Sequence, residues 1–201
     1  VADRTLSRAE EAVNRVKDSR FSAAEVNAAE LEDIRSLIRK VKPDVVINAV
    51  DPRFVMPIFL SCEIENTNYI DMAMSLSRPH PHYPNSETGV KLGDEQFARD
   101  WNWGERQIYA LVGMGIEPGM SDVFARYAED HLFSRIDSFT IFDGSNLTVE
   151  GYDFAPSFSI WTTIEECLNP PLVWEDGRGW YTTEPFSEIE VFDFPEGIGP
   201  V

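Results

Sequence analysis

The sequence contains few cysteines, few histidines and no long apolar run, and each shortage excludes a class of protein. The two cysteines among its 201 residues, Cys62 and Cys167, lie far apart and outside any CxxC pair. A disulfide framework and a zinc site are therefore not expected. No apolar run approaches the roughly 20 residues of a membrane span, and we recognise no secretory leader. We expect a cytoplasmic protein that does not bind membranes.

Basic residues are also scarce, since 17 lysines and arginines face 35 acidic residues and leave a net charge of -18. The excess lies in residues 51–201, which hold 8 basic and 26 acidic side chains, whereas residues 1–50 hold 9 of each. A field of that sign repels nucleic acid, so a nucleic-acid binder is not expected. It favours a cationic substrate or serves only to keep the protein in solution.

Residues 74–93 lack any periodicity and contain three prolines together with His80 and His82. This composition predicts a long exposed loop, which could act as a lid. Two histidines at this spacing could bind a metal ion, but no third ligand accompanies them. We therefore expect no metal.

Apolar residues in the first 120 residues alternate between short continuous runs and helical spacing. The runs predict strands over 1–5, 21–26, 44–50, 68–73 and the stretch from 110. The helical spacing predicts helices over 6–16, 31–41, 55–65, 94–106 and 123–133. Strands separated by single helices are typical of a parallel α/β sheet wound on both faces, so we predict a Rossmann-type domain over 1–120.

The composition changes after this point, and residues 121–201 predict a second domain of the α+β class. Ser138–Phe142 has the composition of a strand, 158–168 has an amphipathic helical face, and short strands follow from Val173. Aromatic residues are frequent here, and we expect most of them in the core. We predict that this domain, incomplete in the chain, binds substrate and mediates dimerisation.

The stretch ALVGMGIEPGMSDVF, from Ala110 to Phe124, joins an apolar run to a helix through a glycine-rich turn. In α/β proteins such turns at strand ends bind ligands, because the amides of the following helix point toward them. An ordinary connection between strand and helix is the alternative.

Asp3 ends the first predicted strand, where a Rossmann fold binds the ribose of a dinucleotide. This acid normally follows a glycine fingerprint by roughly 20 residues, and here no fingerprint precedes it. Either the fold binds no dinucleotide, or its first strand and glycine loop are absent from this chain.

Several stretches together resemble the saccharopine dehydrogenase family. VADRT with SRAE, the run from Asp44 to Val50, and TNYID at 67–71 are similar to three successive strands of its cofactor domain. GIEPGMSD at 115–122 is the most specific match, although Glu117 stands where the family usually has aspartate. Landmarks of the substrate domain, such as FSIW at 158–161, follow in order.

The resemblance implies an oxidoreductase that transfers hydride between NAD or NADP and a carbon–nitrogen bond of an amino acid or a secondary-amine conjugate of one. It implies that Tyr69 and Glu117 are catalytic and handle protons or position water. The implied cofactor-binding residues are Asp3, Arg4, Asn27, Ala49, Val50, Asp51, Gly113, Met114 and Gly119. The implied substrate-binding residues are Asp71, Asp122 and Trp161.

Alternatives remain open for several of these residues. Tyr69 is otherwise a core tyrosine with a bonded hydroxyl, and Glu117 and Asp122 are otherwise acids at a helix N-terminus. Asp3 favours NAD, whereas Arg4 beside it would stack on adenine or bind the 2'-phosphate of NADP. At the level of the whole protein, the alternative is a non-enzymatic cofactor-sensing or assembly protein with a Rossmann-like fold. In either case we expect a homodimer.

Overall fold

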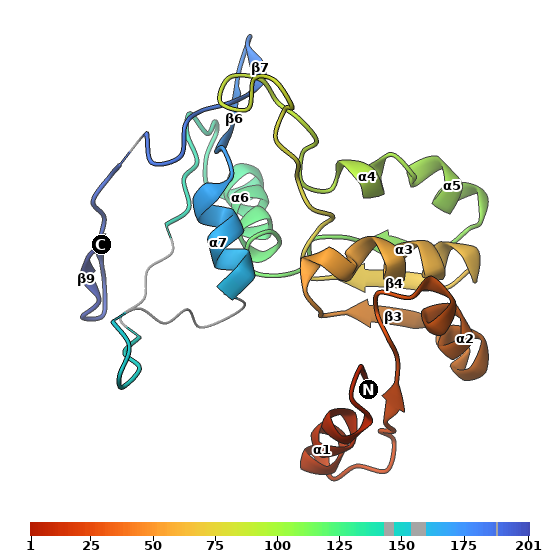
Figure 1. The fold of residues 1–201 in the computed structure, drawn as a ribbon. Coiled ribbons are helices and arrows are strands. Elements are labelled where there is room, and N and C mark those ends of the chain that lie inside the picture. The colour runs from red at the N-terminus through yellow and green to blue at the C-terminus, as the bar shows by residue number, and fades with distance from the viewer. Residues whose placement is uncertain (143–146, 154–159, 188) are drawn as a thin grey trace. The chain divides into compact units, whose positions relative to one another are not determined.

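The computed structural model describes residues 1–142, 147–153, 160–187 and 189–201 (Figure 1). The chain forms two compact units, one of residues 1–75 and 93–118 and the other of 76–92 and 119–201. The units therefore change over between Pro118 and Gly119, two residues before the predicted domain limit, and the second unit also takes in 76–92. The limits of independently folding domains stay a prediction.

The first unit alternates strands and helices, as the periodicity predicts. Its elements are β1 (Ala2–Asp3), α1 (Leu6–Val16), β2 (Ala24–Glu25), α2 (Leu31–Val41), β3 (Val45–Asn48), α3 (Val55–Ile64), β4 (Asn68–Asp71), α4 (Asp94–Phe97), α5 (Asp100–Glu105) and β5 (Ala110–Leu111). The helices α1 and α2 have the predicted bounds. The single helix predicted over 94–106 is two short helices, and the strands are shorter than predicted.

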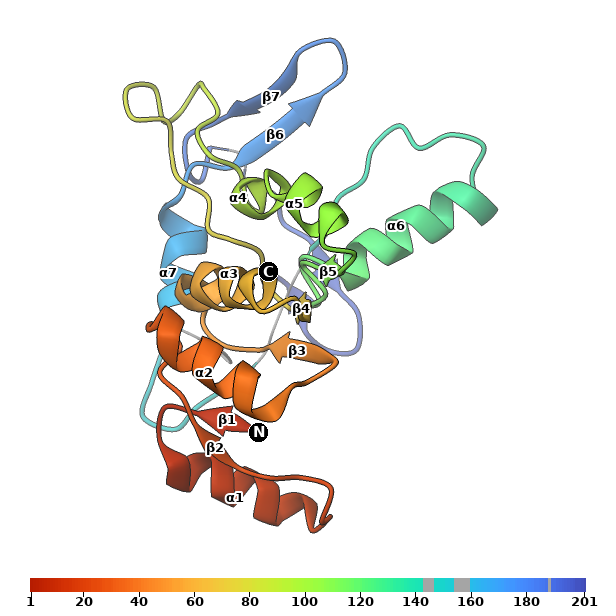
Figure 2. The same cartoon turned by 90° about the vertical axis from the view of Figure 1, so that its right-hand side faces the viewer.

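All strands of the first unit that pair do so in parallel, which is the pattern of a Rossmann-type sheet. β1 pairs with β2, and β3, β4 and β5 form a second sheet in that order (Figure 2). Among the described residues, β1 and β3 each pair along one edge only. Side chains of β1, β2, α2 and β3 line an apolar groove of about 320 Å³.

The core of this unit lies between α2, α3, α5 and the three-stranded sheet. Phe59 of α3 packs against Trp103 and Tyr69, with ring centroids 4.7 and 5.3 Å apart. Cys62 lies in the same cluster, and burial raises the pKa of its thiol to about 12. Cys62 is thus a buried free thiol, as expected, whereas Cys167 is free but exposed.

The other face of the three-stranded sheet carries exposed apolar side chains. The strand register aligns Ile47 with Ile70 and Ile70 with Leu111. Ile47 is 62% exposed and Leu111 53% exposed. Because side chains alternate between the faces of a strand, this row lies opposite the face covered by α3.

The described residues of the second unit form two helices and two antiparallel hairpins, which agrees with the predicted α+β class. Its elements are α6 (Met120–His131), α7 (Ile160–Leu168), β6 (Leu172–Glu175), β7 (Gly179–Thr182), β8 (Asp193–Phe194) and β9 (Gly199–Pro200). Ser138–Phe142, predicted as a strand, is not one. The prediction that the aromatic residues form a core is wrong for Tyr152, Trp174, Trp180, Phe186 and Phe192, which are exposed. Isolated two-stranded hairpins cover too little surface to bury such side chains.

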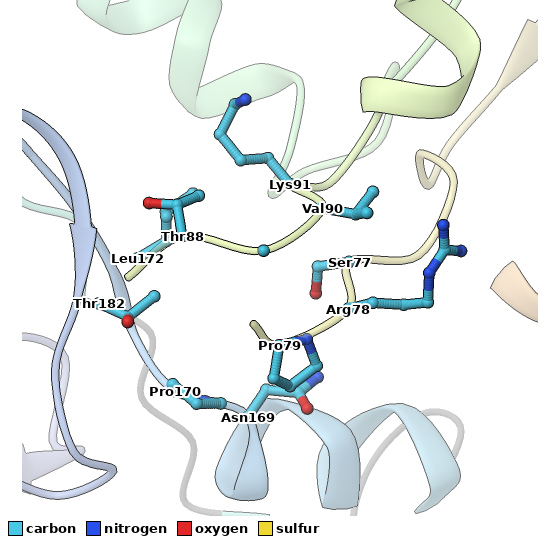
Figure 3. Close-up of a pocket in the computed structure, with 11 residues that line it drawn as sticks. Ser77, Arg78, Pro79, Thr88, Val90, Lys91, Asn169, Pro170, Leu172 and Thr182 are labelled. Carbon is cyan, nitrogen blue, oxygen red and sulfur yellow. The ribbon is translucent and has the colours of Figure 1, made fainter. Parts of the chain in front are cut away.

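The predicted loop over 74–93 contains no helix or strand, and its ends pair through an isolated bridge between Arg78 and Val90. The Thr182 hydroxyl of β7 donates to the Pro84 carbonyl over 2.7 Å, so the loop is tied to this hairpin. A cavity of about 50 Å³ lies between them (Figure 3). The charged ends of Arg78 and Lys91 extend away from it. This volume accommodates a few water molecules and excludes a dinucleotide.

Candidate functional site

The carboxyl ends of the parallel strands hold most of the predicted site residues of the first unit. Asp3 ends β1, Asn27 follows β2, and Ala49 to Asp51 follow β3. Tyr69 and Asp71 lie on β4, and Gly113 follows β5. Ligands of parallel α/β sheets bind at this edge.

At the ends of β1 and β2 the predicted cofactor residues lie around an open polar pocket. Arg4 is exposed and, with Asn27, lines this pocket of about 550 Å³. Lys40 of α2 also lines it, next to acidic side chains. Asp3 accepts a hydrogen bond from the Thr5 amide over 2.7 Å through one carboxylate oxygen. This pocket therefore offers two cations and an amide group to a ligand.

After β3 the chain turns through a short 3-10 helix that begins at Pro52. Ala49 and Val50 are exposed there. The Asp51 carboxylate accepts from the Arg53 amide over 3.0 Å and from its guanidinium over 2.9 Å. The guanidinium holds the pKa of Asp51 below its usual range, so Asp51 is charged at neutral pH.

Tyr69 and Asp71 are buried and hydrogen-bonded to each other. The Tyr69 hydroxyl donates to the Asp71 carboxylate over 2.9 Å and accepts from the Asn48 side-chain amide over 2.9 Å. Tyr69 is 1% exposed and Asp71 has no exposed surface. Burial raises the pKa of both side chains, so the phenol is protonated at neutral pH.

Gly113 belongs to the turn after β5 and donates its amide to the Asp71 carboxylate over 2.7 Å. Its φ of 68° lies in the left-handed region that favours glycine. Met114, next along the chain, is exposed and donates its amide to the Asp71 carbonyl over 2.8 Å. The predicted glycine-rich turn is therefore fixed directly to the end of β4.

Glu117 is exposed at the end of the first unit. Gly119 and Asp122 belong to the second unit, where the Gly119 amide donates to the Asp122 carboxylate over 2.9 Å at the start of α6. This is the bond of an acid at a helix N-terminus, the alternative reading of Asp122. The third predicted substrate residue, Trp161, belongs to α7, but its side chain lies outside the described residues.

The structure thus joins Tyr69, Asp71 and Gly113 in one bonded group and adds two residues that the sequence did not indicate as site residues. Asn48 is the only polar side chain within the apolar run of β3, a signal that a buried partner exists. Gln96 lies in a polar helix start and gives no such signal, although its amide donates to Asp71 over 2.7 Å.

Two further properties of the described residues concern other kinds of site. No three histidine, cysteine, aspartate or glutamate side chains in this part of the chain lie close enough to hold a metal ion. No helix within the described residues is long and apolar enough to cross a membrane.

Comparison with known proteins identifies the family. Residues 1–111 match the family model described as the saccharopine dehydrogenase NADP binding domain. The chain belongs to this family. The match confirms the predicted resemblance, the Rossmann-type fold and NAD or NADP as the class of cofactor. Predicted cofactor residues lie at the carboxyl ends of β1, β2, β3 and β5.

Three curated relatives resemble nearly the whole chain. It is 32% identical to carboxynorspermidine synthase of Vibrio alginolyticus and 29% identical to that of Vibrio cholerae, over 97% and 98% of its length. It is 24% identical to carboxyaminopropylagmatine dehydrogenase of Synechocystis over 97% of its length. The matches cover 48%, 48% and 46% of these proteins, so the chain spans about half the length of its relatives.

Among solved structures, saccharopine dehydrogenase (L-Glu forming) of Saccharomyces cerevisiae matches 66% of this chain and 25% of its own. The TM-score is 0.48 and the sequence identity 17%.

Proposed function

We propose that the protein is an NAD(P)-dependent oxidoreductase that transfers hydride at a carbon–nitrogen bond of an amino acid or of a secondary-amine conjugate of one. The observation that carries the proposal is the match of residues 1–111 to the NADP-binding family, together with relatives named as a carboxynorspermidine synthase and a carboxyaminopropylagmatine dehydrogenase. Those names describe carboxylated amines, which supports a substrate of that class.

The residues at the strand ends suit the parts of a dinucleotide. Asp3, Arg4 and Asn27 would hold the adenosine half, because they surround or adjoin the open pocket at the ends of β1 and β2. Ala49 to Asp51 and the turn of Gly113 and Met114 would hold the nicotinamide half, after β3 and β5. Gly119, at the start of α6, remains a proposed cofactor residue.

When bound, the nicotinamide supplies or accepts the hydride, and the chain must manage the proton of the amine. Glu117 is the exposed carboxylate among the predicted catalytic residues, and we propose it for proton handling. Tyr69 is predicted for the same task, but its buried hydroxyl already donates to Asp71. Asp122 and Trp161 remain the proposed substrate residues.

Two apolar surfaces of the first unit support a further strand and helix in the whole protein. The groove lies beside the edges of β1 and β3 that pair with no described strand. Its apolar lining is the kind that surrounds a buried parallel strand. The apolar row of Ile47, Ile70 and Leu111, of which Ile47 and Leu111 are exposed, is the kind of surface expected beneath a helix. Since a glycine turn joins such a strand to its helix, we propose that this unit carries the missing cofactor fingerprint.

The homodimer and the cytoplasmic location also stay proposals. Trp174 and Trp180 face each other across β6 and β7 and are 56% and 51% exposed. A cross-strand pair of exposed tryptophans is typical of a surface that another protein covers, which supports a dimer through the second unit.

Thermal melting of the whole protein with NADPH, NADH or no ligand tests the proposed function. A cofactor at 100 times its Kd stabilises the folded state by about 2.7 kcal/mol, which raises the melting temperature. We expect a rise with at least one cofactor and oxidation of NADPH or NADH in the presence of an imine formed from an amino acid. No rise with either cofactor would contradict the proposal.

The same experiment distinguishes an oxidoreductase from the alternative, a non-enzymatic cofactor-sensing or assembly protein. Cofactor binding without turnover on any amine or imine, and no effect of Glu117→Gln on that binding, would favour the cofactor-sensing alternative. A loss of turnover in Glu117→Gln with unchanged cofactor affinity would support the catalytic role.

A further inference from the structure

The Asp71 carboxylate is the centre of a buried hydrogen-bond network at the carboxyl ends of β3, β4 and β5. One oxygen accepts from the Tyr69 hydroxyl over 2.9 Å and from the Gln96 side-chain amide over 2.7 Å. The other oxygen accepts from the Gly113 amide over 2.7 Å. All three donors favour the charged form of Asp71, against the rise in pKa that burial causes.

Gln96 carries this network to a second segment. Its carbonyl oxygen accepts the Ser75 amide over 2.7 Å, which leaves its NH2 group for Asp71. The Ser75 carbonyl accepts the Gly93 amide over 2.9 Å. Ser75 and Gly93 are the residues at which the chain leaves this unit and returns to it. Asp71 and Gln96 therefore fix that crossing point as well as the turn.

Close packing constrains the turn at Gly113 in addition to these hydrogen bonds. A Cβ at Gly115 would lie 2.4 Å from the Met72 carbonyl oxygen, so the turn packs directly against the backbone that follows β4. The Gly115 amide donates to the Pro118 carbonyl over 3.0 Å. The turn is therefore held by the Asp71 carboxylate at Gly113 and by its contact with the backbone that follows β4.

We propose that Asp71 and Gln96 are a positioning pair that holds the Gly113–Met114 turn and the Ser75 segment in the geometry that binds the nicotinamide half of the cofactor, and that Asp71 does not contact substrate. Both oxygens of Asp71 are buried and bonded, so the carboxylate has no surface to offer an amine. The link to the cofactor rests on the proposed function, whereas the link to the turn rests on the hydrogen bonds alone.

The Asp71→Asn variant tests the pair because an amide cannot accept at both oxygen positions. If its NH2 group faces Gly113, that amide loses its acceptor. If it faces Gln96, the Gln96 amide must turn over, and the Ser75 amide loses its acceptor instead. Asp44→Asn is the matched control, because it removes the same charge from an exposed residue that precedes β3.

The measurements are amide hydrogen exchange and NADPH affinity of the whole protein, both well below the melting temperature. In Asp71→Asn we expect exchange at Gly113 or Ser75 to rise about tenfold or more while the β3 amides keep their protection. We expect the Kd for NADPH to rise about tenfold, because the Gly113 turn or the Ser75 segment loses a hydrogen bond that positions it. In Asp44→Asn neither quantity changes.

Unchanged exchange at both amides in Asp71→Asn would overturn the proposal, as would unchanged NADPH affinity with raised exchange. If the wild-type protein binds neither NADPH nor NADH, the proposed function fails, and the exchange still tests the positioning pair. Should Asp71→Asn not fold, Gln96→Leu replaces it. That variant keeps the carboxylate, and we expect faster exchange at Ser75 alone, whereas unchanged exchange there would overturn the role of Gln96.

Discussion

The carboxyl ends of β3, β4 and β5 differ from those of β1 and β2 in how their polar groups are satisfied. At the ends of β3, β4 and β5, the side chains of Asn48, Tyr69 and Asp71 are buried and bond to one another. At the ends of β1 and β2, Arg4 is exposed and Asp3 is partly exposed beside an open pocket. We call the ends of β3, β4 and β5 the closed end and the ends of β1 and β2 the open end.

This difference indicates two kinds of contribution to one site. Groups of the closed end lose water and must bond to each other, so their substitution costs stability and displaces the turns they hold. Groups of the open end keep their water until a ligand arrives, so their substitution changes ligand choice with little effect on stability. Two substitutions measure the contrast, and a third tests a buried carboxylate elsewhere in the first unit.

Tyr69→Phe has the largest expected effect on stability, since it removes the hydroxyl between the Asn48 amide and the Asp71 carboxylate. Both groups stay buried and each loses a partner, so we expect a loss of about 1–3 kcal/mol in the free energy of unfolding. Urea unfolding measures it. Tyr109→Phe is the control, since Tyr109 is 77% exposed, and we expect a change within about 0.5 kcal/mol.

An unchanged stability of Tyr69→Phe together with a loss of turnover would instead support the catalytic role predicted for Tyr69. The closed end would then open in solution far enough for the hydroxyl to reach the substrate.

Glu63→Gln tests a second buried carboxylate, which bonds chiefly to a cation, with the Asn102 side-chain amide as a further donor over 3.3 Å. The Arg99 guanidinium donates to Glu63 over 2.8 Å and holds the pKa of that carboxyl below its usual range. Glu63 is 3% exposed, and Arg99 is partly exposed. We expect the free energy of unfolding to fall by about 1–2 kcal/mol at pH 7, because the charged Arg99 guanidinium would then have only a neutral acceptor.

The sign of its pH dependence follows from the lowered pKa. The unfolded chain binds the proton more readily, so the stability that Glu63 contributes is present above about pH 4.3 and is lost as the pH falls through the folded pKa. Urea unfolding at several pH values should show the wild type and Glu63→Gln converging at low pH. An equal gap at pH 7 and pH 3 would contradict this account, and Glu105→Gln, an exposed site on α5, is the control.

The sequence predicted the helices of the first unit well where apolar residues recur over three turns. α1 and α2 have the predicted bounds, since one face of each supplies a continuous apolar stripe. The helix predicted over 94–106 breaks near Ala98 because it lacks such a stripe. Ser138–Phe142 has strand-forming residues but no partner strand among the described residues, and composition cannot supply a partner.

The site was predictable to the level of strand ends. Gly113 lies in the glycine-rich turn that the pattern predicted after a strand, whereas Asp71, at the end of β4, was implied by the family resemblance. Their bond to each other spans 42 positions and the bond of Asp71 to Gln96 spans 25. Such bonds depend on how α4 packs against the sheet, so the sequence alone did not reveal that Asp71 is enclosed.

Arg4→Ala has the smallest expected effect on stability and tests the open end. Arg4 is exposed, so we expect the free energy of unfolding to change by less than about 0.5 kcal/mol. If Arg4 binds the 2'-phosphate, the loss of a charge-assisted hydrogen bond raises the Kd for NADPH about tenfold and leaves NADH binding unchanged. Fluorescence titration with both cofactors measures this, with Arg8→Ala of α1 as the control.

The pattern across the two cofactors distinguishes the two contacts predicted for Arg4. If Arg4 stacks on adenine, Arg4→Ala would weaken the binding of NADPH and NADH equally, since both carry the same base. Unchanged binding of both would place the phosphate elsewhere in the pocket, where Lys40 is the remaining cation that lines it. A large loss of stability in Arg4→Ala would contradict the contrast itself, because it would show that the open end also holds the fold together.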